Sequence, residues 1–211
     1  NKMPLIGDHA PEFHAMTTQG KIDFPADYKG SWVVLFSHPA DFTPVCTTEF
    51  IALSRMNETF ESLNTKLIGL SIDSLHSHLG WIKSIEALNF NNEGKVKIPF
   101  PIIADISMNV AKKYGMLQTV ANTQTVRAVF IIDPEGMIRT ILYYPMSTGR
   151  NIPEIIRILQ SLQLNDKTHY STPANWQPGD DVVMGAPLTI EEAQERLESS
   201  DNTIKPLDWY L

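Results

Sequence analysis

Cysteine is almost absent from this sequence, because Cys46 is the only one among 211 residues. A disulfide needs two cysteines, so neither an internal disulfide framework nor a CxxC redox pair can form within the chain. The lone thiol is therefore either part of the packed core, which is the commoner fate of a free cysteine, or a reactive group. The residues around Cys46 in the sequence must show whether it is a core residue or a reactive group.

Long apolar runs and clusters of basic residues are also missing. No run approaches the roughly 18 to 20 residues that span a bilayer, so we expect no membrane segment. No charged start followed by an apolar stretch precedes a cleavage site, and we expect a cytoplasmic protein. The net charge of −7, with Lys and Arg scattered singly, makes a nucleic acid an unfavourable partner. The balance of 43% hydrophobic and 19% charged residues is that of an ordinary globular protein.

Periodicity of the apolar residues predicts strands that alternate with helices. Short apolar runs predict strands over 32–36, 66–72, 101–104, 126–132 and 137–143. Apolar residues at helical spacing predict helices over 46–63, 79–88, 109–114 and 152–164. The last two strands flank Asp133-Pro134-Glu135-Gly136, a turn sequence, and so form a hairpin. This order predicts an α/β fold, a mixed β-sheet flanked by helices, which is compatible with a thioredoxin-like core.

The character of the sequence changes after residue 164. Pro173, Trp176 and Pro178 interrupt regular structure, and one more helix follows, where Thr189 and Glu192 form a capping-box pattern. We therefore expect a core over 1–164 and a C-terminal arm domain over 165–211. Apolar residues of the arm are expected either to fold back on the core or to cover a partner subunit.

The sequence around Cys46 predicts a reactive thiol. Thr43 followed by Pro44 is typical of a helix start, because threonine caps free amides and proline suits the first helical position. Cys46 then stands in the first turn, at a place where a side chain can reach a substrate. Unpaired N–H groups and the helix dipole there favour thiolate over thiol, so we expect a lowered pKa for Cys46. Pro39 and Pro44 are expected to stiffen the loop and to limit solvent access to the sulfur.

The pattern Pro39-x-x-x-Thr43-x-x-Cys46 resembles the active-site signature of the peroxiredoxins, the AhpC/TSA family. The preceding His38 and the run from 41 to 49 are most similar to the one-cysteine, peroxiredoxin 6-type branch. Similarity covers nearly the whole chain and includes the segments 66–74, 99–103, 147–151 and 172–176. The resemblance implies a thioredoxin-like fold and a thiol-dependent peroxidase that serves antioxidant defence.

Roles for individual residues follow from the resemblance. It implies that Cys46 attacks a peroxide oxygen of hydrogen peroxide or a small organic hydroperoxide and becomes a sulfenic acid. Thr43 would hydrogen-bond the peroxide, and Arg127 would favour the thiolate and the charge on the leaving oxygen. Glu49, three residues after Cys46, would hold the arginines in place, and Arg150 is a second candidate.

The role of His38 stays open between orienting the loop, tuning the sulfur, bonding the oxidised form and a purely structural place. His76-x-His78 offers two metal ligands on a strand, but no third ligand stands at a recognisable spacing, so we expect no metal site. No cofactor is expected either.

Partners also follow from the single cysteine and the resemblance. Oxidised Cys46 has no resolving cysteine in its own chain, so an external thiol reductant is expected, and the sequence does not choose which. The resemblance implies a homodimer and leaves a decameric ring open.

Three other functions compete with the peroxidase. Some relatives also hydrolyse phospholipids, but Ser31 lacks the closing glycine of a G-x-S-x-G elbow, and Pro25 stands where those relatives have a histidine, so we predict no lipase. A hydrolase using Cys46 and His38 lacks an oxyanion hole that we can place. A redox sensor or an oligomeric chaperone-like protein would be oxidised without turnover.

Overall fold

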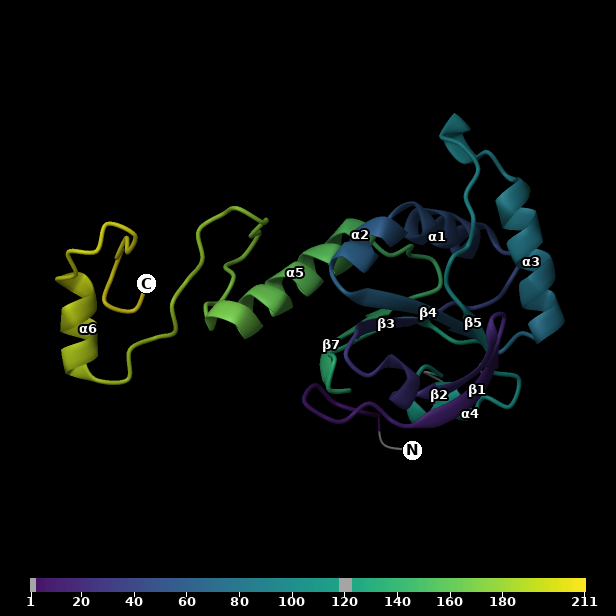
Figure 1. Cartoon of the computed structure of the whole chain (residues 1–211), viewed down its shortest axis with the longest axis horizontal. Helices are drawn as coiled ribbons and strands as arrows, with labels where there is room; N and C mark the ends of the chain where they lie inside the picture. The colour runs from purple at the N-terminus through teal and green to yellow at the C-terminus, as the bar shows by residue number, and fades with distance from the viewer. Residues whose placement is uncertain (1–2, 118–122) are drawn as a thin grey trace. The chain divides into compact units, whose positions relative to one another are not determined.

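The computed structural model describes residues 3–117 and 123–211. The chain divides into two compact units, Asn1–Pro153 and Glu154–Leu211. Figure 1 shows both units, and each is described here by itself. The predicted division into a core and an arm after residue 164 stays a prediction.

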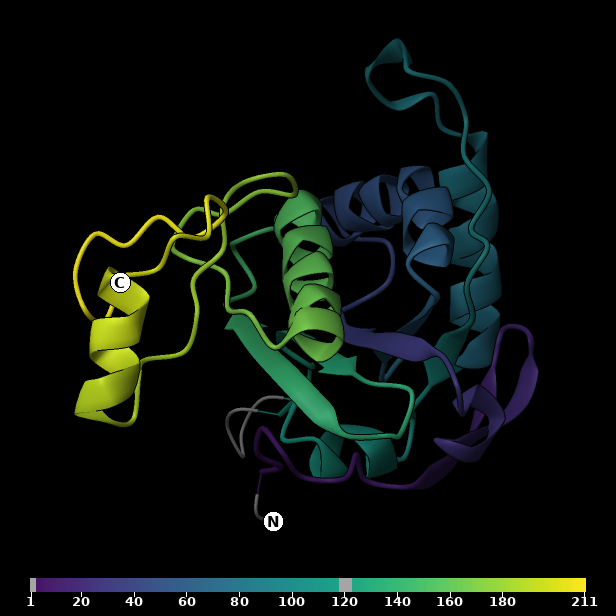
Figure 2. The same ribbon diagram turned by 60° about the vertical axis from the view of Figure 1, so that its left-hand side comes forward.

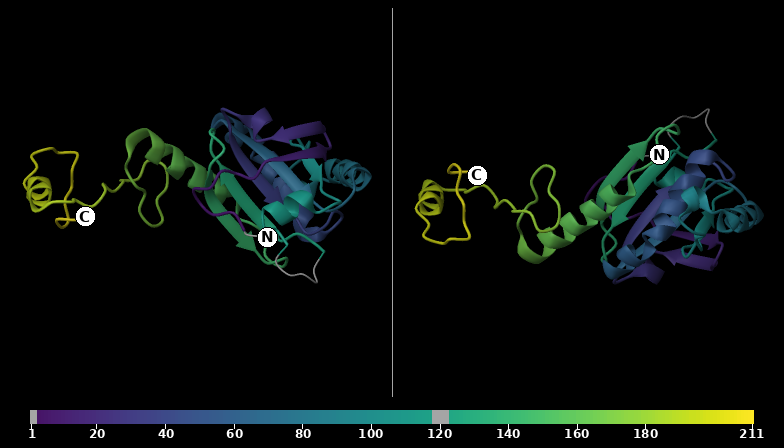
Figure 3. Two further views of the ribbon diagram at one scale, coloured as in Figure 1. Left: turned by 90° about the horizontal axis from the view of Figure 1, so that it is seen from below. Right: turned by 90° about the horizontal axis from the view of Figure 1, so that it is seen from above.

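A mixed sheet of seven strands, in the order β2-β1-β5-β4-β3-β6-β7, forms the first unit. β3 pairs in parallel with β4 and β4 with β5, whereas the other neighbours are antiparallel. The two views of Figure 3 show the strands of this unit fanning as in a twisted sheet. The strands are β1 (Phe13–Thr17), β2 (Gly20–Phe24), β3 (Trp32–Ser37), β4 (Thr65–Ser71), β5 (Ile102–Ala104), β6 (Arg127–Ile132) and β7 (Ile138–Tyr144).

The central strands β3 and β6 are buried along their whole length and are apolar except for Ser37 and Arg127. A strand that reads as a continuous apolar run is covered on both faces of the sheet, which confirms the mixed, helix-flanked sheet that the sequence predicts. The hairpin of β6 and β7 is also confirmed, with residues 133–136 at its turn. The hairpin of β1 and β2 is not predicted by the apolar pattern, since these strands bury mainly their end residues.

The helices lie close to their predicted places, with one correction. The single helix predicted over 46–63 is two helices, because the backbone leaves helical geometry at Met56 (φ −96°, ψ 4°). Short 3-10 turns occupy Ala26–Tyr28 and Phe90–Asn92. Figure 1 shows α1 and α2 over one side of the sheet and α4 on the other. The helices of the first unit are α1 (Pro44–Arg55), α2 (Asn57–Ser62), α3 (Leu75–Ala87) and α4 (Asn109–Lys113).

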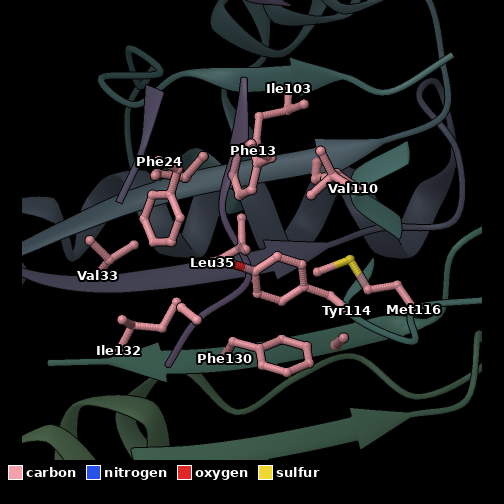
Figure 4. Close-up of a cluster of buried hydrophobic side chains, with 14 of the residues drawn as sticks. Phe13, Phe24, Val33, Leu35, Ile103, Val110, Tyr114, Met116, Phe130 and Ile132 are labelled. Atoms are coloured by element: carbon pink, nitrogen blue, oxygen red, sulfur yellow. The ribbon is translucent and has the colours of Figure 1, made fainter. Parts of the chain in front are cut away.

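A cluster of buried apolar side chains between the sheet and α4 forms one core (Figure 4). Phe13 stacks on Phe24 with ring centroids 5.0 Å apart, and Tyr114 meets Phe130 edge to face at 5.1 Å. Leu35 of β3 is fully buried among them. Burial of this apolar surface stabilises the packing of β3 and β6 in the sheet.

The second unit contains most of α5 (Ile152–Thr168) and all of α6 (Ile190–Leu197). Figure 2 shows long connections without regular structure between these two helices. The predicted cap of α6 is confirmed, because Thr189 Oγ1 accepts a hydrogen bond from the amide of Glu192 at 3.1 Å. Among the described residues, no helix is both long and apolar enough to cross a membrane.

Candidate active site

Cys46 lies in the first turn of α1, directly after the loop that follows β3. Thr43 is the residue before the helix, Pro44 is its first residue, and Cys46 is therefore the third, as the sequence predicts. Proline fits this position because the first amides of a helix have no intrahelical acceptor. The sulfur thus sits at the positive end of the α1 dipole.

The cap that the sequence predicts at Thr43 is not formed. Its side chain accepts no hydrogen bond from the helix amides. Instead, Thr43 Oγ1 donates to the carbonyl oxygen of Ala40 at 2.7 Å. The hydroxyl hydrogen therefore stabilises the loop, and the oxygen lone pairs stay available to accept from another group.

Arg127, the first residue of β6, meets both the sulfur and a carboxylate. Its Nη1 donates to Cys46 Sγ at 3.2 Å and to Glu49 Oε1 at 2.6 Å. Its Nε donates to the carbonyl oxygen of Met146 at 2.9 Å. The planar guanidinium group is thereby fixed by three partners, a geometry that a lysine could not reproduce.

Arg150 holds the other side of the same carboxylate. Its Nε and Nη2 donate to the two carboxylate oxygens of Glu49 at 2.6 and 2.9 Å, which is a bidentate pair. Its Nη1 donates to the carbonyl oxygens of Ser37 and Ala128 at 2.8 and 2.9 Å. Arg150 therefore ties α1 to the ends of β3 and β6.

Glu49 is buried, with a side chain only 2% exposed. Its place on α1 is therefore not that of a helix charge in solvent. Burial alone would raise the pKa of Glu49, but hydrogen bonds and charge from Arg150, together with the charge of Arg127, outweigh burial and lower it. Glu49 is thus an ionised carboxylate between two guanidinium groups.

The sulfur is more enclosed than the sequence predicts. Cys46 has 0% exposure, so the sulfur is closed to solvent and, in this conformation, its side chain does not reach a substrate as expected. Pro39 is buried and Thr43 half-buried, whereas Pro44 is exposed. Phe42 has φ 58°, a left-handed conformation that is uncommon for an aromatic residue. A substrate that reaches the sulfur would have to displace the groups that cover it.

His38 directly follows β3 and joins a buried hydrogen-bond group. Its Nε2 lies 2.7 Å from Asp41 Oδ1, and the second carboxylate oxygen of Asp41 lies 2.6 Å from His78 Nδ1. The carbonyl oxygen of His38 accepts from Thr125 Oγ1. His38 also packs against the ring of Phe50, which is one helical turn beyond Cys46.

The prediction about metal ligands needs correction. His76 and His78 lie on α3, not on a strand, and only His78 is buried. Around His78 the fold collects ligand atoms of His38, Asp41 and Asp73, all within 4.8 Å of one another. Both histidines already bind the Asp41 carboxylate, the Asp73 carboxylate accepts from the backbone amide of Asp41, and we propose no metal there.

Ser31 and Pro25 line one shallow surface hollow, together with Asp133 and Glu135. None of the described residues that line it is a histidine. A serine nucleophile there would have no imidazole base among these residues, and the absence of lipase activity stays a prediction.

Sequence reasoning did not find Asp41, His78 and Thr125 as members of the site. Asp41 and Thr125 are residue types that are common in loops, so the sequence does not mark them. Only the fold brings His78 of α3 to the loop before α1. The candidates Cys46, Glu49, Arg127 and Arg150 do lie together.

Comparison with known proteins finds similarity to peroxiredoxins. Residues 6–141 match the AhpC/TSA family, and residues 161–200 match the C-terminal domain of 1-Cys peroxiredoxin. A peroxiredoxin of Methanosarcina mazei is 58% identical over 211 residues, which cover 99% of this chain and 96% of the relative. Peroxiredoxin 2 of Sulfurisphaera tokodaii is 50% identical over 214 residues, 100% of this chain and 96% of the relative.

Solved structures that are similar to this chain are also peroxiredoxins. A yeast mitochondrial 1-Cys peroxiredoxin, whose thiol is resolved via glutathione/thioredoxin systems, aligns with a TM-score of 0.81 and 45% identity over 91% of this chain and 92% of the other. A mutant of peroxiredoxin 6 from Arenicola marina aligns with a TM-score of 0.80 and 39% identity over 90% of this chain and 88% of the other. The sheet and its helices thus have the fold of these proteins.

Proposed function

Because the chain belongs to the AhpC/TSA family of peroxiredoxins, which are thiol-dependent peroxidases, we propose that it reduces hydrogen peroxide and small organic hydroperoxides with Cys46 as nucleophile. The observation that carries the proposal is the contact of Cys46 Sγ with Arg127. Counted together, Glu49, Arg127 and Arg150 have one negative and two positive charges. A thiolate at Cys46 brings this buried group to neutrality, which favours the reactive form.

In the proposed reaction the Cys46 thiolate attacks one oxygen of the peroxide, and the O–O bond breaks. The sulfur becomes a sulfenic acid, and the leaving oxygen takes a proton to give water or an alcohol. Arg127 supports the negative charge that moves from sulfur to the leaving oxygen. Thr43 accepts a hydrogen bond from the peroxide O–H, since its own hydrogen is donated to Ala40. Pro39 and His38 shape the loop that encloses the reactants.

An external thiol regenerates the enzyme. A first thiolate attacks the sulfenic sulfur and forms a mixed disulfide with release of hydroxide, which becomes water, and a second thiol then reduces that disulfide. No second cysteine exists in the chain for this step. The glutathione/thioredoxin systems that serve the yeast relative are the first reductants to test. An antioxidant role follows from such turnover, and the expected cytoplasmic location stays a prediction.

We also propose a homodimer that pairs the edges of two sheets. β7 is the outermost strand on its side of the sheet, next to β6. An edge strand that is rich in apolar residues and leaves backbone groups unpaired favours pairing with another strand. The C-terminal arm is proposed to support the same contact.

Turnover separates the peroxidase from a redox sensor. In the presence of excess glutathione or thioredoxin, the chain should consume many equivalents of peroxide, and Cys46→Ser should consume none. Consumption that stops after one equivalent with every reductant would favour the sensor, and full activity of Cys46→Ser would reject the proposed mechanism.

A further inference from the structure

The buried group of His38, Asp41 and His78 lies beside the loop that leads to Cys46. Asp41 uses a different carboxylate oxygen for each histidine, at 2.7 Å from His38 Nε2 and 2.6 Å from His78 Nδ1. The side chains of all three are at most 1% exposed. Because water does not solvate these side chains, their hydrogen-bond partners determine which atoms carry hydrogen.

The partners of His78 indicate a ring with two hydrogens. Its Nε2 lies 2.9 Å from the carbonyl oxygen of Ile103, which can only accept, so Nε2 carries a hydrogen. Its Nδ1 faces a carboxylate oxygen of Asp41. Burial tends to raise the pKa of Asp41, but hydrogen bonds from His38 and His78 hold it far below its usual range, so the carboxylate is ionised. Nδ1 therefore also carries a hydrogen, and His78 is an imidazolium.

The partners of His38 indicate a neutral ring of one tautomer. Its Nε2 donates to Asp41, whereas its buried Nδ1 has no hydrogen-bond partner among the described residues. Burial lowers the pKa of His38, which favours the neutral form. Buried polar atoms without a partner are rare in folded proteins and often mark a site that a ligand completes.

We infer that Asp41 and His78 are positioning residues, an ion pair that keeps His38 neutral, with hydrogen on Nε2 and a lone pair on Nδ1 that can accept from a small O–H donor. The inference rests on the proposed function for its effect on rate, since peroxides are such donors. His78 balances the charge of Asp41, so that His38 does not have to take up a proton to do so.

The charged groups that face His38 make the role of His78 testable. They are Asp41 in the same loop, Asp73 after β4, and His78 on α3. The positive charge of His78 lowers the pKa of His38, and the two carboxylates raise it. His78→Gln should therefore raise the pKa of His38 and place a proton on Nδ1 at higher pH.

The direct test is ¹⁵N NMR of the histidine side chains in the intact protein, with signals assigned through His38→Gln and His78→Gln. At neutral pH we expect two N–H nitrogens for His78 and, for His38, a hydrogen on Nε2 with a bare Nδ1. A neutral His78, or a hydrogen on His38 Nδ1, would overturn the inference. The hydrogen positions are read in the native protein, and the variants serve only to assign the signals, so this measurement does not depend on peroxidase activity.

The rate provides the second readout. In His78→Gln the acid limb of the peroxide-consumption profile should move to higher pH together with the His38 titration. At a pH below the His38 pKa, raising that pKa by one lowers the neutral fraction of the ring about tenfold. His76→Gln, on the exposed side of the same helix, should change neither the titration nor the profile. An unchanged His38 titration in folded His78→Gln rejects the positioning role. Full activity of Cys46→Ser would instead reject the proposed function and leave the NMR result intact.

Discussion

At the scale of single residues, the environment of Cys46 depends on the pairing of one carboxylate with two guanidinium groups. Glu49 contacts Arg127 and Arg150 at 2.6 Å each. Removing one member of a buried ion pair typically costs about 3–5 kcal/mol, because the partner charge remains buried. The contact of Arg127 with the sulfur therefore depends on Glu49, even though Glu49 does not touch the sulfur itself in the contacts described.

We predict that Arg127→Lys slows oxidation of Cys46 by hydrogen peroxide about a hundredfold. A lysine ammonium is a point charge and cannot bind Cys46, Glu49 and Met146 at once. The second-order rate of oxidation, followed by stopped-flow tryptophan fluorescence or by quenched mass analysis, measures the effect. Arg139→Lys, the same exchange on β7, is the control and should keep the native rate. An Arg127→Lys rate within twofold of native would contradict this role.

The lowered pKa of Glu49 predicts how stability depends on acid. A carboxylate whose pKa is lower in the folded state contributes stability that is present above the unfolded pKa, about 4.3, and is lost as pH falls through the folded value. The native chain should therefore lose free energy of unfolding steeply below about pH 4. Glu49→Gln should be less stable at neutral pH and lose less on acidification.

Urea unfolding at a series of pH values measures this dependence. The control is Glu93→Gln, because Glu93 pairs with Arg55 at the surface and is 59% exposed. Its curve should run parallel to that of the native chain. Parallel curves for native and Glu49→Gln would show that Glu49 is not held ionised by the arginines.

At the scale of elements, the place of the site follows from how β3, α1 and β6 meet. The loop after β3 leads into α1, and β6 lies antiparallel to β3, so the first residue of β6 comes beside the first turn of α1. Two glycines differ in their backbone geometry. Gly136 turns the chain between β6 and β7 with φ +85°, and Gly80 lies inside α3.

Two alanine substitutions should change stability in opposite directions. Gly80→Ala should stabilise the chain by up to about 1 kcal/mol, because alanine is the better helix former and its Cβ would meet only Phe42 at an ordinary 3.5 Å. Gly136→Ala should destabilise by about 1–2 kcal/mol, because a side chain is strained at positive φ. Thermal and urea unfolding of both variants measure this. If both substitutions changed the free energy of unfolding in the same direction, the backbone geometry described here would be contradicted.

Much of the element order could be predicted from the sequence, because apolar spacing reports burial directly. The short helix break at Met56 and the β1–β2 hairpin could not, since the apolar stripe continues past Met56 and the hairpin strands bury little of their length. For the site, the resemblance indicated Arg127, and spacing put Glu49 on the side of Cys46. The pairing of Glu49 with Arg150, 101 residues away, depends on tertiary structure and has no local signal.

At the scale of the whole molecule, the proposed pairing of two β7 strands predicts the oligomeric state. Leu142 lies near the middle of β7 and is half-buried. Leu142→Lys places two like charges close together in a paired edge and should convert the dimer to monomer. Sedimentation at micromolar concentration measures the change. Met16→Lys on β1, which has a strand on either side, should remain dimeric. A native chain that sediments as a monomer would contradict the proposal.

The central claim, that Cys46 beside Arg127 is the atom that peroxide oxidises, is tested most directly by intact-mass analysis after brief exposure to about one equivalent of hydrogen peroxide. The account predicts a gain of one oxygen that candidate thiols reverse. The gain should be absent in Cys46→Ser and much slower in Arg127→Lys. A native chain that gains no oxygen, or a Cys46→Ser variant that gains the same reversible oxygen, would contradict the account.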